Sequence, residues 1–502
     1  MTEEIIMSKI KIGWSEKSII PEGAKVSLAG QFYERVSDKV ESPLTVTVFA
    51  VENGEDAFVM CSCDLVSIGY QLVCSVRDRL EGKISLPLDK IMISAIHTHT
   101  APSYARRSDN YSGGGAQCLE KFTPEGVKYE ELIKTDADDI FRDEEAHSYI
   151  ADRIAEAVIE AWNQRDEGMY AEAFGRAAVG MCRRVCYDDG SAKMWGDTNK
   201  ANFTELEGGN DSGIEILFTY DKNKKLTGVV ANVACPAQVL EHRNFISSDY
   251  WGKVKEFLRA EYGDNLYVLG LVSPAGDQCP RDMIRWVSPE TPINDPNIVR
   301  DYVIDRTADP SMFDISGCKK AARRISDEIK YAFAEVDTYV DDAELIHKTI
   351  KLDVPVRRVT MEERDRAEEA IKRFFEQNKS GTINFNDTAK LFVHSGTLAR
   401  FEDQETKNVD EIEVHVIRLG NVAFATNPFE LFLDYGNRIR ARSKAKQTFL
   451  IQLCCGAKGY LPTEKAEKGS HYSAYVSSGI TGHEGGDLLV RKTVSEINNM
   501  FE

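Results

Sequence analysis

Residues 93–102 read ISAIHTHTAP, a stretch that joins an apolar run to two imidazole side chains and a proline. Side chains of a strand alternate between its two faces, so residues two apart point the same way. His97 and His99 are therefore expected side by side where the strand ends. Imidazole is the commonest metal ligand in proteins and titrates near neutral pH. The pattern predicts a metal or acid–base site here, with a purely structural histidine pair as the alternative.

Predicted strands and helices alternate on both sides of this stretch. Segments rich in β-branched residues predict strands at 43–51, 57–64, 90–97 and 226–235, and a hairpin with a Gly-Asn turn at 414–425. Apolar residues at helical spacing predict helices at 68–80, 143–165, 250–262, 318–334 and 361–378. This alternation predicts one large mixed α/β body that takes in residues 1–502.

Two long segments interrupt the alternation. Residues 104–142 contain a Ser-Gly-Gly-Gly run and many charges, and residues 277–314 are rich in proline and charge toward their end. Long loops in compact proteins are often functional. Both segments are predicted to be loop insertions that cover a site.

The composition restricts the partners of the chain. Its 62 basic and 81 acidic side chains give a net charge of −19, which argues against nucleic acid or an anionic membrane as a main partner. No stretch approaches the ~20 apolar residues that cross a bilayer, so no stable membrane insertion is expected. A small molecule is the predicted partner, and the oligomeric state is left open.

The N-terminus and the cysteines both indicate a cytoplasmic protein. The first residues, MTEEIIM, are acidic and lack the layout of a signal peptide. The 11 cysteines are then expected to be reduced. No CxxC pair suggests a structural zinc site, and most of the cysteines lie in apolar stretches, so we expect buried thiols.

Polar side chains follow several of the predicted strands. Beyond the two histidines, these strand ends carry Asp64, Cys235-Pro236 with Glu241-His242, the run AGDQCPR at 275–281, and the run NPFE at 427–430. Ligands of α/β proteins bind beyond the carboxyl ends of strands. We therefore expect these groups to share one pocket that can hold a metal.

These motifs resemble, in the same order, those of the catalytic domain of the neutral/alkaline, non-lysosomal ceramidases. The family has ISATHTHSGP where this chain has residues 93–102, and GDVSP around its serine nucleophile where residues 276–280 read GDQCP. The family has an Asn-Arg segment where residues 182–184 read CRR. It has a His-Pro pair and then Ser-Ala-Asp or Ser-Ser-Asp, where this chain has Cys235-Pro236 and Ser247-Ser248-Asp249.

Two later motifs complete the resemblance. The family has Pro-Gly-Glu where this chain has Pro428-Phe429-Glu430, and GYVTT where residues 459–463 read GYLPT. The chain is thus similar to a divergent member over roughly residues 13–487. The resemblance implies a large mixed α/β catalytic body of the neutral ceramidase type, here without the C-terminal immunoglobulin-like domain of the family.

The resemblance also implies one zinc ion per chain. The family holds zinc with the first histidine of HTH, the histidine before the proline, the glutamate and the tyrosine. His97, Glu430 and Tyr460 keep their places, whereas Cys235 stands where the second histidine belongs. A thiolate is a good zinc ligand, so Cys235 can replace the imidazole directly. Alternatively, His242 turns in and completes the site.

The position of the nucleophile departs from the family as well. Cys279 replaces the serine, and a thiol attacks strongly when a metal or a cation lowers its pKa. Arg183 and His99 are expected to supply that positive field, and Asp277 lies in the same motif. Cys279 is alternatively a metal ligand or a packing residue, in which case water activated by zinc attacks. His99 is expected to transfer protons rather than bind the metal.

The segment after HTH argues against ceramide as the substrate. Residues 103–107 read SYARR where the family has a glycine-rich SGPGG. Arg106, Arg107, Arg183 and Arg184 suit an anionic group. The sequence predicts a zinc-dependent hydrolase that cleaves an amide or related C–N bond in a small polar substrate. The alternatives are an altered relative that binds a metal and a ligand without turnover, or a metal-dependent enzyme of glycan metabolism.

Overall fold

A twisted eight-stranded sheet forms the larger half of the computed structural model. The structure describes residues 9–31, 33–104, 113–130, 137, 139–284, 286–287, 307–308 and 314–502. In spatial order the strands are β16 (Tyr267–Val272), β15 (Leu226–Val233), β14 (Gly213–Asp221), β9 (Asp166–Arg176), β1 (Lys11–Ser18), β4 (Thr45–Glu52), β5 (Ala57–Cys63) and β6 (Ile91–Ala95). Only the outer pairs, β15–β16 and β5–β6, are parallel among these strands. The sheet is therefore mixed, as the sequence predicts.

A second sheet of four strands packs against the first. Its order is β20 (Leu345–Pro355), β22 (Val409–Leu419), β23 (Val422–Thr426) and β25 (Gln447–Ile451). Pairing of Leu419 with Val422 closes the predicted hairpin over a two-residue turn, where Gly420 has a φ of +57°. Backbone bonds join the sheets, for example from Gln452 N–H to the carbonyl of Val272 at 3.0 Å. The residues after β25 are thereby held next to the ends of β16 and β6.

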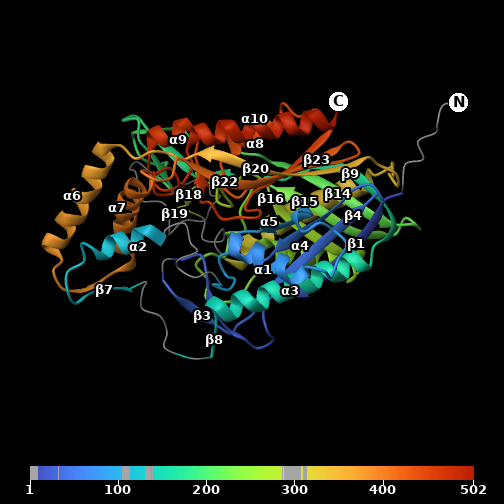
Figure 1. Cartoon of the computed structure of the whole chain (residues 1–502), viewed down its shortest axis with the longest axis horizontal. Coiled ribbons are helices and arrows are strands. Elements are labelled where there is room, and N and C mark those ends of the chain that lie inside the picture. The colour runs from blue at the N-terminus through green and yellow to red at the C-terminus, as the bar shows by residue number, and fades with distance from the viewer. Residues whose placement is uncertain are drawn as a thin grey trace, which may run out of the picture.

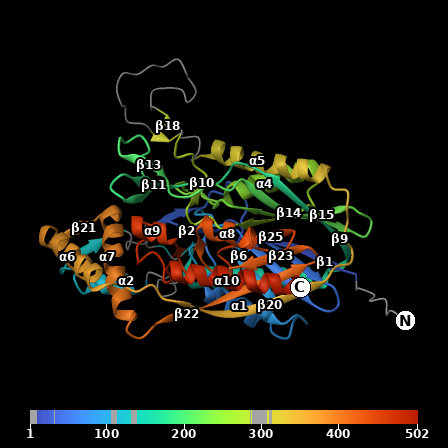
Figure 2. The same ribbon diagram turned by 90° about the horizontal axis from the view of Figure 1, so that it is seen from above.

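Helices cover the outer faces of both sheets (Figures 1 and 2). The helices α1 (Tyr70–Leu80) and α3 (Asp143–Asn163) pack on the strands around β1 and β4, and α4 (Asp249–Tyr262) and α5 (Ile315–Ala334) pack beside β16 and β9. The four-stranded sheet is covered by α10 (His483–Met500), which also contacts α8 (Leu433–Arg440). Ser15 shows the close fit of α3, because its hydroxyl donates to the Ala157 carbonyl at 2.7 Å.

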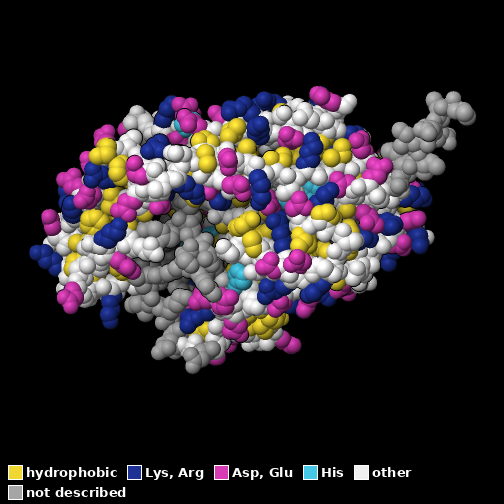
Figure 3. Space-filling model, viewed as in Figure 1, with side chains coloured by type: hydrophobic (Ala, Val, Ile, Leu, Met, Phe, Trp, Pro, Cys, Tyr) yellow, Lys and Arg dark blue, Asp and Glu magenta, His cyan; other side chains and the backbone are white. Residues whose placement is uncertain are grey.

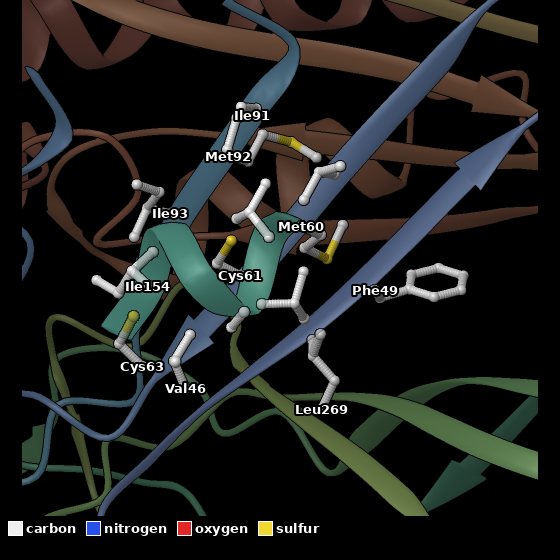
Figure 4. Close-up of a cluster of buried hydrophobic side chains, with 14 of the residues drawn as sticks. Val46, Phe49, Met60, Cys61, Cys63, Ile91, Met92, Ile93, Ile154 and Leu269 are labelled. Carbon is white, nitrogen blue, oxygen red and sulfur yellow. The ribbon is translucent and has the colours of Figure 1, made fainter. Parts of the chain in front are cut away.

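Apolar side chains fill the space between the layers. Figure 4 shows Ile91 and Ile93 of β6, Met60 and Cys61 of β5, and Ile154 of α3 in one buried cluster. Every side chain of β5 and β6 is buried, which explains why both segments read as unbroken apolar runs. This packing fixes the direction of β6 and therefore the position of the turn after it, which contains the two histidines.

A small lobe at one end of the molecule consists of α2 (Gly113–Glu120), α6 (Met361–Gln377), α7 (Phe385–Asp403), β7 (Val127–Tyr129) and β21 (Gly381–Ile383) (Figures 1 and 2). Residues 104–142 were predicted to be a loop, yet the described part carries α2 and β7. Leu119 packs against Leu391 and Leu398 of α7 in a separate apolar cluster. Tertiary burial therefore stabilises a helix that its own glycine-rich sequence does not favour.

Short strands and turns hold the residues that the sequence predicted for the site. The pairs β24 (Glu430–Leu431) with β26 (Tyr460–Leu461), and β10 (Met181–Cys182) with β17 (Gln278–Cys279), lie outside both large sheets. The remaining short elements are β2 (Lys25–Leu28), β3 (Arg35–Ser37), η1 (Leu88–Lys90), β8 (Ile140–Phe141), β11 (Arg184–Tyr187), β12 (Ala192–Met194), β13 (Phe203–Leu206), β18 (Trp286–Val287), β19 (Thr307–Ala308) and α9 (Glu464–Gly469).

The surface is strongly charged. Acidic and basic side chains are interspersed over the face drawn in Figure 3. Within the described part of the chain, none of the helices has the length and apolar character to span a membrane.

Candidate active site

The two histidines lie in a buried turn beyond β6. The strand ends at Ala95, two residues earlier than predicted, and His97 has a left-handed φ of +71°. The His97 N–H donates to the carbonyl of Leu65 at 3.0 Å, and its Nδ1 lies 2.7 Å from the carbonyl of Val66. Nδ1 must carry the proton, because a carbonyl oxygen only accepts. Nε2 is therefore the nitrogen of His97 that remains available to bind a metal.

The two imidazoles meet through their Nε2 atoms, which are 3.3 Å apart. The side-chain amide of Gln238 is oriented by Arg183, whose guanidinium donates to Gln238 Oε1 at 3.1 Å. The amide nitrogen of Gln238 consequently faces His99 Nε2, at 3.2 Å, as a donor. A neutral His99 accepts this bond with the single lone pair of Nε2. His99 Nε2 can therefore bind a metal only after it releases the Gln238 amide.

The surroundings of His99 keep its ring neutral. Burial, and secondly the neighbouring His97, lower the pKa of His99 from its usual 6.5 to about 3, although Glu241 opposes this. The Glu241 carboxylate lies 3.9 Å from His99 Nδ1. Burial, the largest single effect, acts to raise the pKa of Glu241, but the hydrogen bond with His242 and the nearby His99 and Arg183 together lower it. Neutral imidazole is the form that binds metals.

Glu430 and Tyr460 come from adjacent short strands. Parallel pairing of β24 with β26 places the two residues directly opposite each other. Glu430 Oε2 lies 3.5 Å from His97 Nε2, and the phenol oxygen of Tyr460 accepts a hydrogen bond from Arg183 at 3.4 Å. Burial and then the Glu430 charge raise the pKa of Tyr460 well above its usual value. The phenol is thus neutral unless additional positive charge reaches it.

The Gly276-Asp277 turn packs tightly against the strand of Glu430. A side-chain carbon at Gly276 would lie 2.3 Å from the Glu430 carbonyl oxygen, so only glycine fits there. Arg183 donates to the Gly276 carbonyl at 3.1 Å and, from its backbone, to the Asp277 carbonyl at 2.9 Å. The carboxylate of Asp277 accepts a hydrogen bond from the backbone N–H of Leu433 at 2.9 Å. Asp277 thereby holds the first residue of α8 in place.

Cys279 lies on β17 and is fully buried. Its Sγ lies 3.4 Å from the carbonyl of Arg281. Burial raises the pKa of the Cys279 thiol to about 12, although the nearby charges of Arg183 and Arg281 act in the opposite direction. The positive field predicted from the sequence is therefore present, but burial outweighs it and keeps the thiol protonated.

The two residues predicted as alternatives for the second imidazole have other contacts in the structure. Cys235 is fully buried, its Sγ lies 3.5 Å from the Pro236 carbonyl, and burial raises its pKa well above the usual value. The His242 side chain is 61% exposed, and its Nε2 lies 3.1 Å from Glu241 Oε1. His99, rather than either of these residues, meets the first histidine.

The predicted arginines separate into different roles. Arg183 is buried in the site, whereas Arg184 pairs with Glu207 and also donates to the carbonyl of Tyr472 at 3.1 Å. Arg184 is therefore a structural residue next to the site. Arg106 and Arg107, and most of the predicted loop at 277–314, lie outside the described residues.

Three contributors to the site were not assigned a role from the sequence. Gln238 orients His99, and Trp195 lies under Arg183 and Arg281 at 5.7 and 5.4 Å from its ring centroid. The ring of Tyr472 lies 5.5 Å from that of Tyr460. A lone glutamine within the apolar run 234–240 is a signal that could have identified the first of these residues. Trp195 and Tyr472 reach the site only through the fold.

Solved structures with the same architecture exist. A crystal structure of neutral ceramidase from Pseudomonas aeruginosa superposes with a TM-score of 0.65 at 15% identity, over 97% of this chain and 74% of the other. A structure described as a ceramidase complexed with C2 superposes with a TM-score of 0.66 at 13% identity, over 98% and 76% of the chains. No protein-family model and no curated protein matches the sequence. Over nearly all of its length, the chain has a neutral ceramidase-like fold.

Proposed function

We propose that this protein is a metal-dependent hydrolase that cleaves an amide bond in a small polar substrate. The observation that carries the proposal is the convergence of the His97 and His99 Nε2 atoms, 3.3 Å apart, with the Glu430 carboxylate 3.5 Å from the first of them. The ceramidase-like fold supports amide hydrolysis as the reaction class.

The spacing of His97 from two neighbours supports a zinc site. Two nitrogens bound at 2.0–2.1 Å to tetrahedral zinc lie about 3.3–3.4 Å apart, and a nitrogen and a carboxylate oxygen are separated similarly. Binding of one ion by His97, His99 and Glu430 would require His99 to release the Gln238 amide and to approach Glu430. The Val66 carbonyl that accepts from His97 Nδ1 is the partner expected for a metal-bound imidazole.

The proposed ligands are His97, His99, Glu430 and Tyr460. His99 takes the place for which the sequence offered Cys235 or His242. When bound, zinc supplies a Lewis acid for the substrate carbonyl and lowers the pKa of a coordinated water. Arg183 holds the Tyr460 oxygen in place and favours its ionised form through its charge.

The residues around these ligands suit a polar substrate. The guanidinium groups of Arg183 and Arg281 both lie against the Trp195 ring, and Arg183 also donates to Tyr460. Guanidinium groups bind carboxylates and phosphates with two parallel hydrogen bonds. We propose that these arginines recognise an anionic or polar group of the substrate, and that Cys279, which lies near both of them, is the candidate nucleophile.

A second candidate function is metal and ligand binding without turnover. The protonated state of the Cys279 thiol favours it, because a neutral thiol is a poor nucleophile. In this case the arginines still bind an anion, but no acyl group is transferred.

Activity assays with defined metal content test both candidates. The protein is stripped of metal, reloaded with zinc and assayed with small N-acyl amino acids, N-acyl sugars and detergent-solubilised ceramide. Zinc-dependent release of a carboxylic acid from a small amide is expected, with little release from ceramide. Zinc and anion binding without turnover of any compound would support the second candidate, and failure to bind zinc would contradict both.

A further inference from the structure

A second group of metal-binding side chains lies in the core. Glu413 and His415 project from β22, Cys455 follows β25, and their ligand atoms all lie within 4.8 Å of one another. All three residues are buried, with at most 4% of any of them exposed. Cys455 contacts the backbone of β6 at Ile93, whose N–H points at Sγ from 3.4 Å.

This group is separate from the site described above. Ile93, which Cys455 contacts, lies within β6, whereas the paired histidines lie in the turn that follows the end of this strand at Ala95. The group lies between the two large sheets, on the buried side of the turn that follows β25. It therefore shares no side chain with the proposed hydrolytic centre.

The distances within the group approach those of a tetrahedral zinc site. The His415 Nε2 and Glu413 Oε1 atoms are 3.0 Å apart, against about 3.3 Å for two such ligands of zinc. The Sγ atoms of Cys454 and Cys455 are 3.9 Å apart, against about 3.8 Å for two sulfurs each 2.3 Å from the metal. Glu413, His415 and Cys455 thus supply three donors close together, and Cys454 would have to move toward Glu413 and His415 to supply a fourth.

Neighbouring groups hold the donors in the form that binds a metal. His347 Nε2 lies 3.0 Å from His415 Nδ1, so it can accept the proton of Nδ1 and leave Nε2 free for a metal. Arg77 donates to both oxygens of Glu413, at 2.6 and 3.0 Å, and Lys351 adds a bond at 2.9 Å. Such outer contacts are typical of metal-bound histidine and carboxylate.

We propose that Cys455, His415 and Glu413 form a buried structural site for a zinc ion, with the neighbouring Cys454 as a fourth donor. Zinc binds the thiolate and the neutral imidazole, so binding releases protons.

The site would brace the loop that carries Glu430. The backbone N–H of Cys454 donates to the Asn427 carbonyl at 3.0 Å, and that of Leu453 donates to the Phe429 carbonyl at 3.2 Å. A metal held by the two cysteines would tie this loop to β22 and so to the second sheet.

Cobalt substitution tests the proposal, because a thiolate bound to Co²⁺ gives an intense near-ultraviolet charge-transfer band that nitrogen and oxygen ligands do not give. The full-length, metal-free protein is titrated with cobalt and then with zinc. We expect the band in the wild type and in His97→Ala, which lacks the proposed hydrolytic metal. In His97→Ala, zinc should displace the cobalt and abolish the band.

Variants locate the site. Cys455→Ser should abolish the band, whereas Cys318→Ser, at a buried thiol in α5, should leave it unchanged. Glu413→Gln keeps all thiols and should weaken cobalt binding at least tenfold. This variant tests the site even if the Cys455→Ser chain does not fold. Absence of the band in the wild type, or its persistence in Cys455→Ser, would overturn the proposal. A band in His97→Ala would support it even if the proposed hydrolytic function failed.

Discussion

Gly30 touches the face of the His99 imidazole so closely that a side-chain carbon at Gly30 would lie 2.5 Å from His99 Cγ. Gly30 also has a φ of +92°, a backbone conformation that residues other than glycine rarely adopt. This contact, 69 residues apart in sequence, fixes the ring that meets His97. The position of the second histidine is therefore set by a segment near the N-terminus as well as by β6.

Gly30→Ala should displace His99 and weaken metal binding. The matched control is Gly23→Ala, since Gly23 also has a positive φ, +71°, but open space around it. Both variants should lose about 1 kcal/mol of stability from backbone strain, and Gly30→Ala should lose a further ~1–2 kcal/mol from the clash. Thermal unfolding and zinc titration measure the two effects. Equal zinc affinity in the two variants would show that the Gly30 contact does not position the ligand.

His97→Ala and His99→Ala should each lose stoichiometric zinc from the proposed hydrolytic site. The sequence resemblance alone predicted that His99→Ala keeps its zinc. The 3.3 Å separation of the Nε2 atoms instead favours a ligand role for both His97 and His99. His242→Ala, at a side chain that is 61% exposed, is the control and should keep its zinc. Elemental analysis after removal of loosely bound metal gives the answer. Zinc retained in His99→Ala and lost in His242→Ala would favour the ligand set predicted with His242.

Cys279 should react slowly with iodoacetamide in the metal-free protein near pH 7. Its pKa of about 12 leaves almost no thiolate, and the residue is fully buried. Cys74, which is partly exposed, should be alkylated first. Peptide mapping by mass spectrometry after timed quenching orders the two sites. Rapid alkylation of Cys279 would instead indicate an activated nucleophile, as the resemblance to the serine position predicts.

Cys279→Ser and Cys279→Ala separate chemistry from packing. If the side chain attacks the acyl carbon, the serine variant should keep part of the activity, and the alanine variant should lose at least ~100-fold in kcat. The unfolding temperature of each variant is measured in parallel, so that a loss of stability is not read as a loss of chemistry. Full activity of Cys279→Ala would assign the attack to water and leave Cys279 a packing role.

Stability should fall in acid because of Glu16 in β1. Burial alone would raise the pKa of Glu16, but Lys255 and Arg259 outweigh it and lower the pKa from 4.5 to about 2. A lowered pKa means that the unfolded chain binds the proton first. The contribution of Glu16 is therefore complete above pH 4.5 and is lost as the pH falls toward 2, by roughly 2–3 kcal/mol. Urea unfolding of the wild type between pH 5 and 3 should show this slope, and Glu16→Gln should flatten it.

The fold class and many helices and strands could be predicted from local pattern. The unbroken apolar runs of β5 and β6, and the helical spacing within α3, follow directly from burial on one or both faces. Residues 113–120 could not be predicted in this way, because their glycine-rich sequence favours a loop and only packing against α7 makes them helical.

From the sequence, the resemblance of its motifs to those of the ceramidase family implied that His97, Glu430 and Tyr460 belong together. Only the tertiary structure decided that His99 meets His97 and that His242 faces solvent, because β6 ends at Ala95 and the chain then turns. The buried group around Cys455 likewise requires the packing of two sheets. The physical reason is that ligand geometry depends on contacts between residues distant in sequence, whereas a motif records only which residues are near each other along the chain.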